Sequence, residues 1–251
     1  MIFLASHQQP LSGNEMNKIL ITFLWTPLKF FLSFLPQHIN IFLKRRIINF
    51  LSYFGYSNSQ NRMDKSIIKF FDFKKKGICL EVGAADGIDQ SNSLHLERIY
   101  NWKVYLVEPT KAQYEQCKIF RRKSTIDNVA FVSEETFKEK KTIEINYEAL
   151  MSSIKDNNFN SDKHENNLQS VETITLDKFF LNNNVKTIDI MILDVEGYEI
   201  EVLEGYKKGS KIIKYLLVEA WDFDTFNNYA EIRGWKFIQK IGNDYLYSLI
   251  N

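Results

Sequence analysis

The chain has few of the residues that mark cross-linked or metal-dependent proteins: two cysteines, four histidines, ten glycines and four prolines among 251 residues. Cys79 lies in an apolar run and Cys117 in a helix-like segment, so the pair predicts neither a disulfide framework nor a zinc site. The histidines lack H-x-x-x-H or H-E-x-x-H spacing, which leaves a histidine-based metal site without support. We therefore expect a reducing compartment and assign no metal ligands.

An excess of charge of one sign is also lacking. Lys and Arg total 32 and Asp and Glu total 31, a net charge of +1, which gives no support to a nucleic-acid partner. Apolar residues make up 45% of the chain, enough for one sizeable core, and this excludes a disordered protein. The sequence contains no N-x-Ser/Thr glycosylation motif, which favours a cytoplasmic location.

Acidic residues are absent between Glu15 and Asp64. Residues 1–63 carry six basic residues against one acidic residue, a net charge of +5, whereas residues 64–251 carry 26 against 30, a net charge of −4. Such a contrast predicts two parts of different character. We therefore divide the chain into a basic, aromatic-rich helical N-terminal extension over residues 1–63 and a second domain over residues 64–251.

The extension is apolar, but a membrane span is not the favoured interpretation. Residues 19–35 hold Pro27 and Lys29 near their middle, and a lysine at the centre of a bilayer costs about 3 kcal/mol. The spacing of their polar residues predicts an amphipathic helix instead. Two interpretations stay open. Either the extension packs on the downstream domain or on another subunit, or residues 17–54 make a peripheral contact with an anionic membrane.

From residue 64, short β-branched runs alternate with amphipathic segments, which predicts an α/β fold built on an open, mostly parallel sheet. The expected strands cover residues 78–82, 103–108, 129–133, 188–195 and 213–221, and the expected helices cover 93–99, 112–120, 176–181, 200–206 and 225–233. Two apolar runs around Gly242 predict a C-terminal antiparallel hairpin. The polar residues 155–170 predict a solvated loop, either a substrate lid or a low-complexity insert.

The stretch CLEVGAADGIDQSNS, residues 79–93, carries the strongest functional signal. Gly83 and Gly87 bracket a tight turn after an expected strand, where a side chain would stop the backbone approaching a nucleotide-like ligand. The next expected strand ends in Glu108, a position from which a carboxylate accepts hydrogen bonds from both hydroxyls of a ribose. The turn and the acid together predict a ribose-bearing cofactor.

The spacing of the turn argues against a nicotinamide cofactor. Such a site uses G-x-G-x-x-G, with a helix N-terminus facing a pyrophosphate, whereas here the glycines are spaced Gly-x-x-x-Gly with Asp86 between them. The acidic frame of Glu81, Asp86 and Glu108 suits a ligand that carries a sulfonium and an ammonium group. S-adenosylmethionine (SAM) carries both, so SAM is the expected cofactor.

Six strings extend this signal along the chain: GAADGIDQSNSLHLE, NWKVYLVEP, DNVAFVS, VETITLDKFF, IDIMILDVEGYEIEVLEG and GWKFIQKIGNDYLYSL. In order and spacing they resemble the FkbM family of SAM-dependent methyltransferases, over residues 64–250. The resemblance implies the class I methyltransferase fold, a Rossmann-like open sheet that ends in an antiparallel hairpin. It leaves the N-terminal extension unexplained.

The resemblance also implies where the cofactor binds. The matching positions are Glu81, Gly83, Ala84, Asp86, Gly87, Glu108, Asn128 and Val129. The first five are the turn and the acid that meets the methionine moiety, and Glu108 is the acid that binds the ribose. The last two stand around the start of the third expected strand, where such folds contact the adenine.

Catalysis is predicted at the carboxyl ends of the fourth and fifth expected strands. Asp194 is the first candidate for the base that deprotonates a hydroxyl acceptor, Glu219 the second and Glu196 the third. Many members of the family have a lysine two residues before this aspartate, where the chain has Ile192. Glu196 is explained equally well, together with Glu199, as a carboxylate favoured by a helix dipole. A divalent metal on Asp194 lacks a complete ligand set.

The expected function is SAM-dependent methyl transfer, and the resemblance implies O-methylation of a sugar, a glycan or a small metabolite. The alternative is a catalytically degenerate SAM-binding protein or a membrane-associated scaffold. Residues 91–93, Ser-Asn-Ser, are interpreted as a helix cap more readily than as a substrate contact.

Overall fold

The computed structural model describes residues 27–30, 32–57, 59–148, 151–154, 168–207, 209 and 212–250. The chain forms two compact units, residues 1–57 and 58–251. The charge pattern places this boundary slightly later, between residues 63 and 64. Ser59 donates a hydrogen bond to Asn92 at 2.7 Å, and Met63 is 1% exposed in a core cluster of the second unit, so both residues belong to that unit.

In its described part, the first unit exposes most of its large apolar side chains. Its main helix, α2 (Gln37–Ser52), has no acidic residue in its first turn. The exposed apolar side chains are Leu28, Phe30, Phe34, Leu35, Ile39, Ile41, Phe42, Phe50, Tyr53 and Phe54. In the part of the chain that the structure describes, no helix is long and apolar enough to cross a membrane. The amphipathic helix expected over residues 19–35 falls partly outside the described residues.

The second unit is built on a seven-stranded sheet with the order β10-β11-β9-β8-β1-β2-β3. Its strands are β1 (Ile78–Val82), β2 (Lys103–Val107), β3 (Thr125–Asp127), β8 (Thr187–Leu193), β9 (Ile212–Val218), β10 (Trp235–Ile241) and β11 (Asp244–Leu249). The pairs among β3, β2, β1, β8 and β9 are parallel, and β11 pairs antiparallel with both β9 and β10. This order confirms the predicted open, mostly parallel sheet with a C-terminal antiparallel hairpin.

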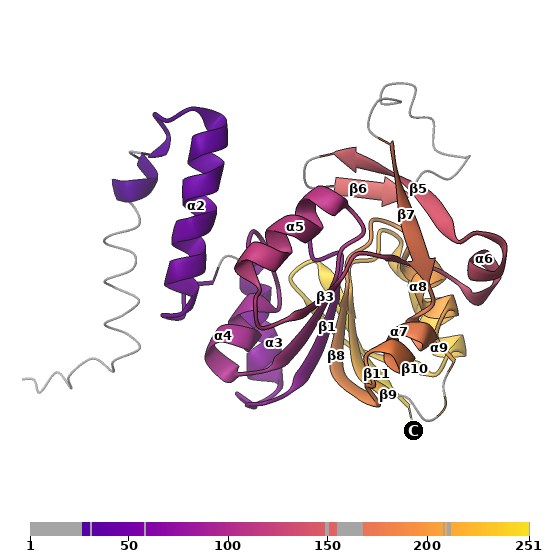
Figure 1. The fold of residues 1–251 in the computed structure, drawn as a ribbon. Helices are drawn as coiled ribbons and strands as arrows, with labels where there is room; N and C mark the ends of the chain where they lie inside the picture. The colour runs from indigo at the N-terminus through magenta and orange to yellow at the C-terminus, as the bar shows by residue number, and fades with distance from the viewer. Residues whose placement is uncertain are drawn as a thin grey trace, which may run out of the picture. The chain divides into compact units, whose positions relative to one another are not determined.

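Helices cover both faces of this sheet (Figure 1). One face carries α3 (Met63–Phe70), which follows the short 3-10 helix η1 (Gln60–Arg62), and also α4 (Leu94–Tyr100) and α5 (Lys111–Phe120). The other face carries α7 (Leu176–Asn182), α8 (Glu199–Glu204) and α9 (Phe223–Ile232). The central strand β8 is almost continuously apolar and buried because both of its faces are covered.

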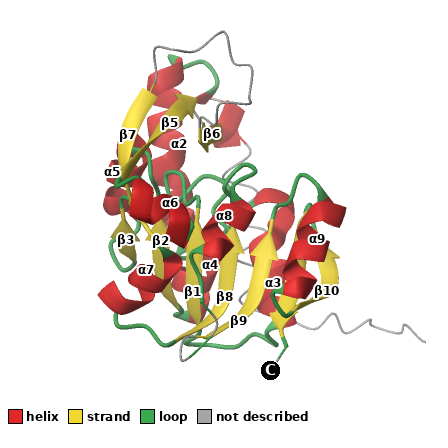
Figure 2. Cartoon of the chain, turned by 90° about the vertical axis from the view of Figure 1, so that its right-hand side faces the viewer, coloured by secondary structure: helices red, strands yellow, loops and turns green. Residues whose placement is uncertain are grey.

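A second, four-stranded sheet lies above the carboxyl ends of the main strands (Figure 2). It has the order β4-β7-β5-β6 and consists of β4 (Ala130–Phe131), β5 (Thr142–Glu148), β6 (Met151–Ile154) and β7 (Leu168–Ile174), with α6 (Glu134–Glu139) between β4 and β5. The alternation of Ile143 and Ile145 with polar residues is a strand signal that the sequence analysis missed.

Two expectations need correction here. The run 129–133 was expected as the third strand of the main sheet, but the third strand is β3, and residues 130–131 pair with β7 in the small sheet. β3 is a short edge strand in which no residue is fully buried, so it lacks the apolar run that marks a central strand. Of the loop expected over residues 155–170, residues 168–170 begin β7, and residues 155–167 lie outside the described part.

Candidate active site

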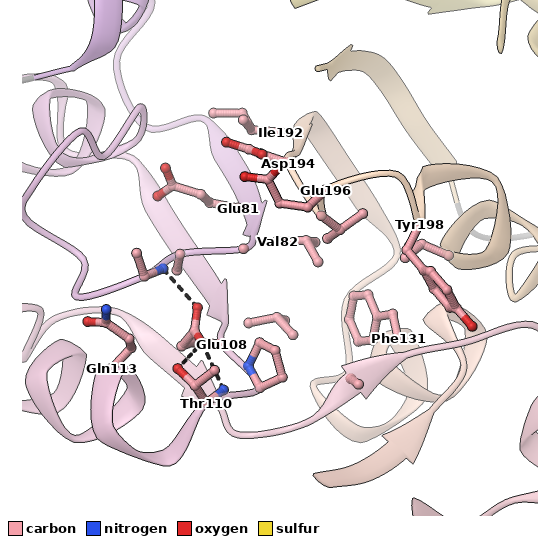
Figure 3. A pocket seen from close by; sticks show the side chains of 18 of the residues that line it. Glu81, Val82, Glu108, Thr110, Gln113, Phe131, Ile192, Asp194, Glu196 and Tyr198 are labelled. Atoms are coloured by element: carbon pink, nitrogen blue, oxygen red, sulfur yellow. Dashed lines mark hydrogen bonds between the residues drawn. The ribbon is translucent and has the colours of Figure 1, made fainter. Parts of the chain in front are cut away.

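A pocket opens at the carboxyl ends of β1, β2 and β8, under the small sheet (Figure 3). Seven of the residues predicted from the sequence line it: Glu81, Gly83, Ala84, Glu108, Val129, Asp194 and Glu196. The other four do not line it: Asp86, Gly87, Asn128 and Glu219. The pocket also takes in residues that sequence reasoning missed, among them Thr110, Gln113 and Tyr198.

The two glycines of the turn after β1 are required because neighbouring protein atoms leave no room for a side chain. Gly83 has φ +84°, and a Cβ there would lie 1.8 Å from the carbonyl oxygen of Asp194. Gly87 has φ +74°, and a Cβ there would lie 2.8 Å from Cγ of Arg121. Asp86 stabilises the turn from inside, because its Oδ1 accepts hydrogen bonds from the amides of Ile88 and Asp89 at 2.9 and 2.7 Å. Close packing therefore requires these glycines, in addition to any approach of a ligand.

Glu108 is held rigidly at the end of β2. Its carboxylate accepts hydrogen bonds from the amide of Ala85 at 2.9 Å and from the amide and hydroxyl of Thr110 at 2.8 and 2.6 Å. Burial raises the pKa of Glu108 to about 7. Thr110 is the N-cap residue of α5, so the same loop positions the acid and begins the helix.

One wall of the pocket is apolar. Val129, Phe131 and Ile145 contribute to it, from the segment after β3 and from the small sheet. Asn128 supports this wall from behind, because its side-chain amide donates to the carbonyl oxygens of Glu108 and Pro109, both at 2.8 Å. The apolar wall meets the polar end of β2 at one corner, an arrangement that suits a flat base joined to a ribose.

Carboxylates gather on the opposite side of the pocket from Glu108, where Figure 3 shows Asp194 and Glu196. In the sheet, Leu193 of β8 is paired with Val218 of β9, and Val218 is paired with Tyr245 of β11. One residue further along each strand toward the pocket, Asp194, Glu219 and Asp244 therefore stand in a row. Burial, followed by repulsion from Glu219 and Glu196, raises the pKa of Asp194 to about 8.

The last member of the row, Asp244, was not predicted from the sequence. Burial and repulsion from Glu219 raise its pKa to about 7. Its place beside Glu219 depends on the register of the terminal hairpin, and no local sequence pattern predicts it. Among the described residues, no group of three or more His, Cys, Asp or Glu side chains is placed to hold a metal ion.

The segment after β8 carries an unusual backbone and an exposed aromatic ring. Glu196 has φ +54°, in the left-handed region that residues other than glycine seldom adopt. The indole of Trp221 donates a hydrogen bond to the carboxylate of Glu196. The ring lies against Gly197, 3.6 Å from the position of a Cβ there, and Trp221 is nevertheless 62% exposed. Glu199 lies in the first turn of α8 and accepts a hydrogen bond from the amide of Gly197 at 2.9 Å.

The Ser-Asn-Ser segment does not act as a side-chain cap. Ser93 is the N-cap residue of α4, but its hydroxyl makes no capping hydrogen bond. It donates instead to the carboxylate of Glu81, which is 4% exposed. Asp222, by contrast, caps α9 by accepting from the amides of Asp224 and Thr225 at 3.1 and 3.2 Å.

Residues 81–245 match the family model of the methyltransferase FkbM domain. An FkbM methyltransferase structure from Methylobacillus flagellatus is similar at 15% identity and a TM-score of 0.43, with 69% of this chain and 43% of that chain covered. The chain thus spans less than half of that protein.

Two further solved structures show similarity of the same distant kind. A methyltransferase from Geobacter sulfurreducens has 11% identity and a TM-score of 0.43, with 86% and 94% of the two chains covered. A fibrillarin from Aeropyrum pernix, crystallised with S-adenosyl-L-methionine, has 10% identity and a TM-score of 0.40, with 70% and 67% covered. No curated protein matches the chain.

Proposed function

The chain belongs to the FkbM family of methyltransferases, and we propose that it transfers a methyl group from its cofactor SAM to a hydroxyl group of a sugar, a glycan or a small metabolite. The observation that carries the proposal is a single pocket with three kinds of wall. These are the glycine turn with Glu108, the apolar wall around Phe131, and the carboxylates Asp194 and Glu196.

The pocket residues fit SAM chemically. The apolar wall suits the adenine, and the fixed carboxylate of Glu108 suits the ribose hydroxyls. The raised pKa of Asp194, about 8, reflects buried negative charge that a cationic ligand would offset. When bound, SAM supplies a methyl group activated by a sulfonium.

The chain's own residues then have two tasks. The pocket walls align the acceptor hydroxyl with the methyl group, and alignment of this kind is worth several kcal/mol. Asp194 takes the proton of the hydroxyl, a contribution of about 10²–10⁴ in rate. Glu219 and Glu196 are the second and third candidates from the sequence, and of these two only Glu196 lines the pocket, which favours Glu196 over Glu219.

The exposed indole of Trp221 supports an acceptor that contains a ring. Its hydrogen-bonding group is bonded to Glu196, a residue that lines the pocket, and Trp221 is 62% exposed three residues beyond the end of β9. Aromatic faces bind the C–H faces of sugar rings, while a neighbouring carboxylate accepts hydrogen bonds from hydroxyls. Trp221 and Glu196 therefore favour a sugar over an open-chain alcohol.

The N-terminal extension supports a second, separate proposal: peripheral contact with an anionic membrane, at the cytoplasmic surface, through residues 17–54. The described part of this range exposes many aromatic and aliphatic side chains and contains Lys44, Arg45 and Arg46 without an acidic residue. Residues 17–26 lie outside the described part.

The proposed function is tested by incubating the protein with methyl-labelled SAM and with glycan and lipid extracts. Label in a glycan or small hydroxylated product supports O-methylation. Binding of SAM without label transfer to any fraction would favour the alternative, a catalytically degenerate SAM-binding protein. Calorimetry on the same sample measures SAM binding independently of transfer.

A further inference from the structure

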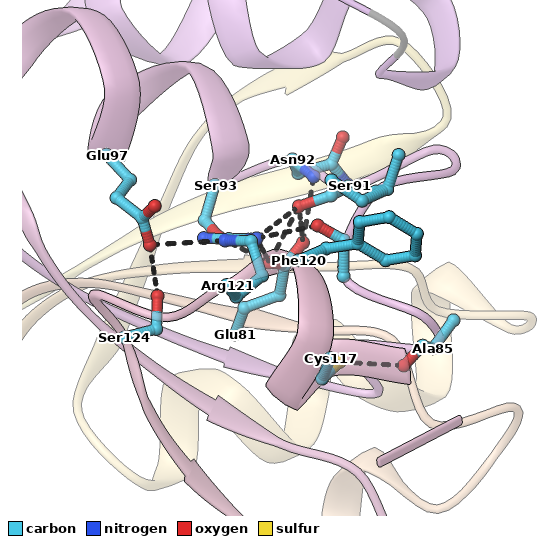
Figure 4. Close-up of polar contacts among 12 residues, drawn as sticks. Glu81, Ala85, Ser91, Asn92, Ser93, Glu97, Cys117, Phe120, Arg121 and Ser124 are labelled. Carbon is cyan, nitrogen blue, oxygen red and sulfur yellow. Dashed lines mark hydrogen bonds and ion pairs between the residues drawn. The ribbon is translucent and has the colours of Figure 1, made fainter. Parts of the chain in front are cut away.

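Arg121 is a fully buried charge behind the pocket, at 0% exposure (Figure 4). It follows α5 directly as the C-cap residue. Its Nη1 donates to the carbonyl oxygen of Gly87 and to the hydroxyl of Ser91, both at 3.0 Å, and its Nη2 donates to the hydroxyl of Ser93 at 2.9 Å. Its Nε donates to Glu97 at 3.2 Å. A single guanidinium thus holds three points of the segment 87–93.

Glu81 holds the same segment from the other side. Its carboxylate accepts hydrogen bonds from the amide of Asn92 at 2.8 Å and from the hydroxyls of Ser91 at 3.1 Å and Ser93. The guanidinium of Arg121 lies 3.9 Å from its Oε2. The hydrogen-bond partners of Arg121 and Glu81 belong to the segment 87–93, and residues 89–92 of this segment line the pocket. The network therefore supports a wall of the cofactor site from behind.

The segment needs this support because its backbone is strained. Gln90, within the segment, has φ +59°, and Ala85, in the turn just before it, has φ +47°, both in the left-handed region. A residue other than glycine in that region keeps its conformation only where its surroundings impose it. The thiol of Cys117 donates to the carbonyl oxygen of Ala85 at 3.0 Å, which adds a contact from the same helix as Arg121.

Helix α5 thereby connects two parts of the cofactor site. Its N-cap residue, Thr110, binds the carboxylate of Glu108, and its C-cap residue, Arg121, binds the wall segment. The network contains two carboxylates, Glu81 and Glu97, and two guanidinium groups, so its charges balance. Arg121 lies close to both carboxylates, and Nη1 of Arg98 lies 3.0 Å from Glu97. A buried guanidinium with fixed geometry imposes these distances more rigidly than a flexible ammonium would.

We propose that Arg121 is a positioning residue for SAM binding: it holds residues 87–93 in the conformation that forms the pocket wall, with Glu81 as its partner. The proposal rests on the proposed function in that the cofactor is SAM. It assigns Glu81 a role in supporting the wall, whereas the family resemblance implies direct contact with the methionine moiety.

The test compares Arg121→Lys with Arg98→Lys. Both variants keep a positive charge in the same buried network, and Arg98 donates to the carbonyl oxygen of Phe120, which does not line the pocket. Both should lower the melting temperature. Only Arg121→Lys should weaken SAM binding, raising the Kd by about tenfold or more, or about 1.4 kcal/mol, at a temperature well below both melting points. Arg98→Lys should leave the Kd within about twofold, since it leaves the wall in place.

A second pair of variants changes no charge and covers the case in which Arg121→Lys fails to fold. Ser93→Ala removes the hydroxyl between Arg121 and Glu81, and Ser124→Ala removes the hydroxyl that binds Glu97 on the side away from the pocket. We expect a raised Kd for Ser93→Ala alone. Equal changes of the Kd within either pair, or an unchanged Kd in Arg121→Lys or Ser93→Ala, would overturn the positioning role. If the unmodified protein does not bind SAM, the proposed function itself fails.

Discussion

Asp194 and Glu219 end two adjacent parallel strands in register, each one residue beyond the paired Leu193 and Val218. The amide of Glu219 donates to the carbonyl oxygen of Leu193 at 3.1 Å, which holds the two strand ends together. Two carboxylates at neighbouring strand ends repel each other, and burial adds to the cost of charging them. The ionisation of Asp194 is therefore coupled to whatever cation enters the pocket.

Replacing Asp194 by asparagine tests its role as the base. Asp194→Asn keeps the size of the side chain but cannot accept the proton, so turnover should fall by about 10²–10⁴. The Kd for SAM should stay within a few fold. Single-turnover assays and calorimetry measure the two quantities. Full turnover in this variant would show that alignment alone drives the reaction, and loss of SAM binding would move Asp194 to the cofactor site.

The same carboxylate predicts a pH dependence with a definite sign. Burial, followed by repulsion from Glu219, raises the pKa of Asp194 to about 8, and a base is active only when deprotonated. Turnover should therefore increase as the pH rises toward the pKa and level off above it. The bound sulfonium lowers the pKa, so the midpoint should lie below 8. A pH profile of kcat at saturating SAM checks this, and a flat profile would contradict it.

Glu108 should account for a measurable part of SAM affinity. Glu108→Ala removes hydrogen bonds to a charged acceptor, which are worth about 1.5–3 kcal/mol, and it also frees the amide of Ala85. Calorimetry should show an increase of the Kd by about one to two orders of magnitude. As a control, Glu115→Ala changes an exposed acid on α5, the helix that follows Glu108, and this acid does not line the pocket. Equal affinity in Glu108→Ala and the unmodified protein would remove this residue from the cofactor site.

Replacing Trp221 should weaken binding of the acceptor without changing the Kd for SAM. With a ring-bearing acceptor identified by label transfer, Trp221→Ala should raise its KM by about 2- to 12-fold, the equivalent of a stacking contact of 0.5–1.5 kcal/mol. Trp221→Phe keeps an aromatic face but loses the hydrogen bond to Glu196, so it separates the two contributions. Steady-state kinetics give the KM and calorimetry gives the Kd for SAM. An unaltered KM in both variants would exclude the indole from acceptor binding.

Membrane contact should depend on the first unit, and cofactor binding on the second unit. A protein that lacks residues 1–57 should bind SAM with the affinity of the full chain, because the pocket lies wholly in the second unit. The full chain should sediment with vesicles of anionic lipid at low salt, less so at high salt, and the shortened protein should not. Vesicles of neutral lipid serve as the control. Failure of the full chain to sediment with anionic vesicles at low salt would refute membrane contact.

Much of the fold could be predicted because its signals are local. The alternation of apolar strands with amphipathic helices identified β1, β2, β8, β9 and the terminal hairpin. The small sheet was missed because β4 holds two residues and residues 155–167 interrupt the pattern between β6 and β7. β5 does alternate, at Ile143 and Ile145, but its pairing with β7 joins segments separated in the chain, and no local pattern specifies that pairing.

The sequence by itself determined the class of the sheet, the glycine turn and the strand-end acids Glu108 and Asp194, since each depends on residues that are neighbours in the chain. Only the tertiary structure decided that Asp244 joins the carboxylate row and that Arg121 supports the turn containing Gly87. Both depend on strand register and helix packing, which bring together residues far apart in the chain. A buried charge reveals its role only through the partners that surround it, and no local pattern specifies them.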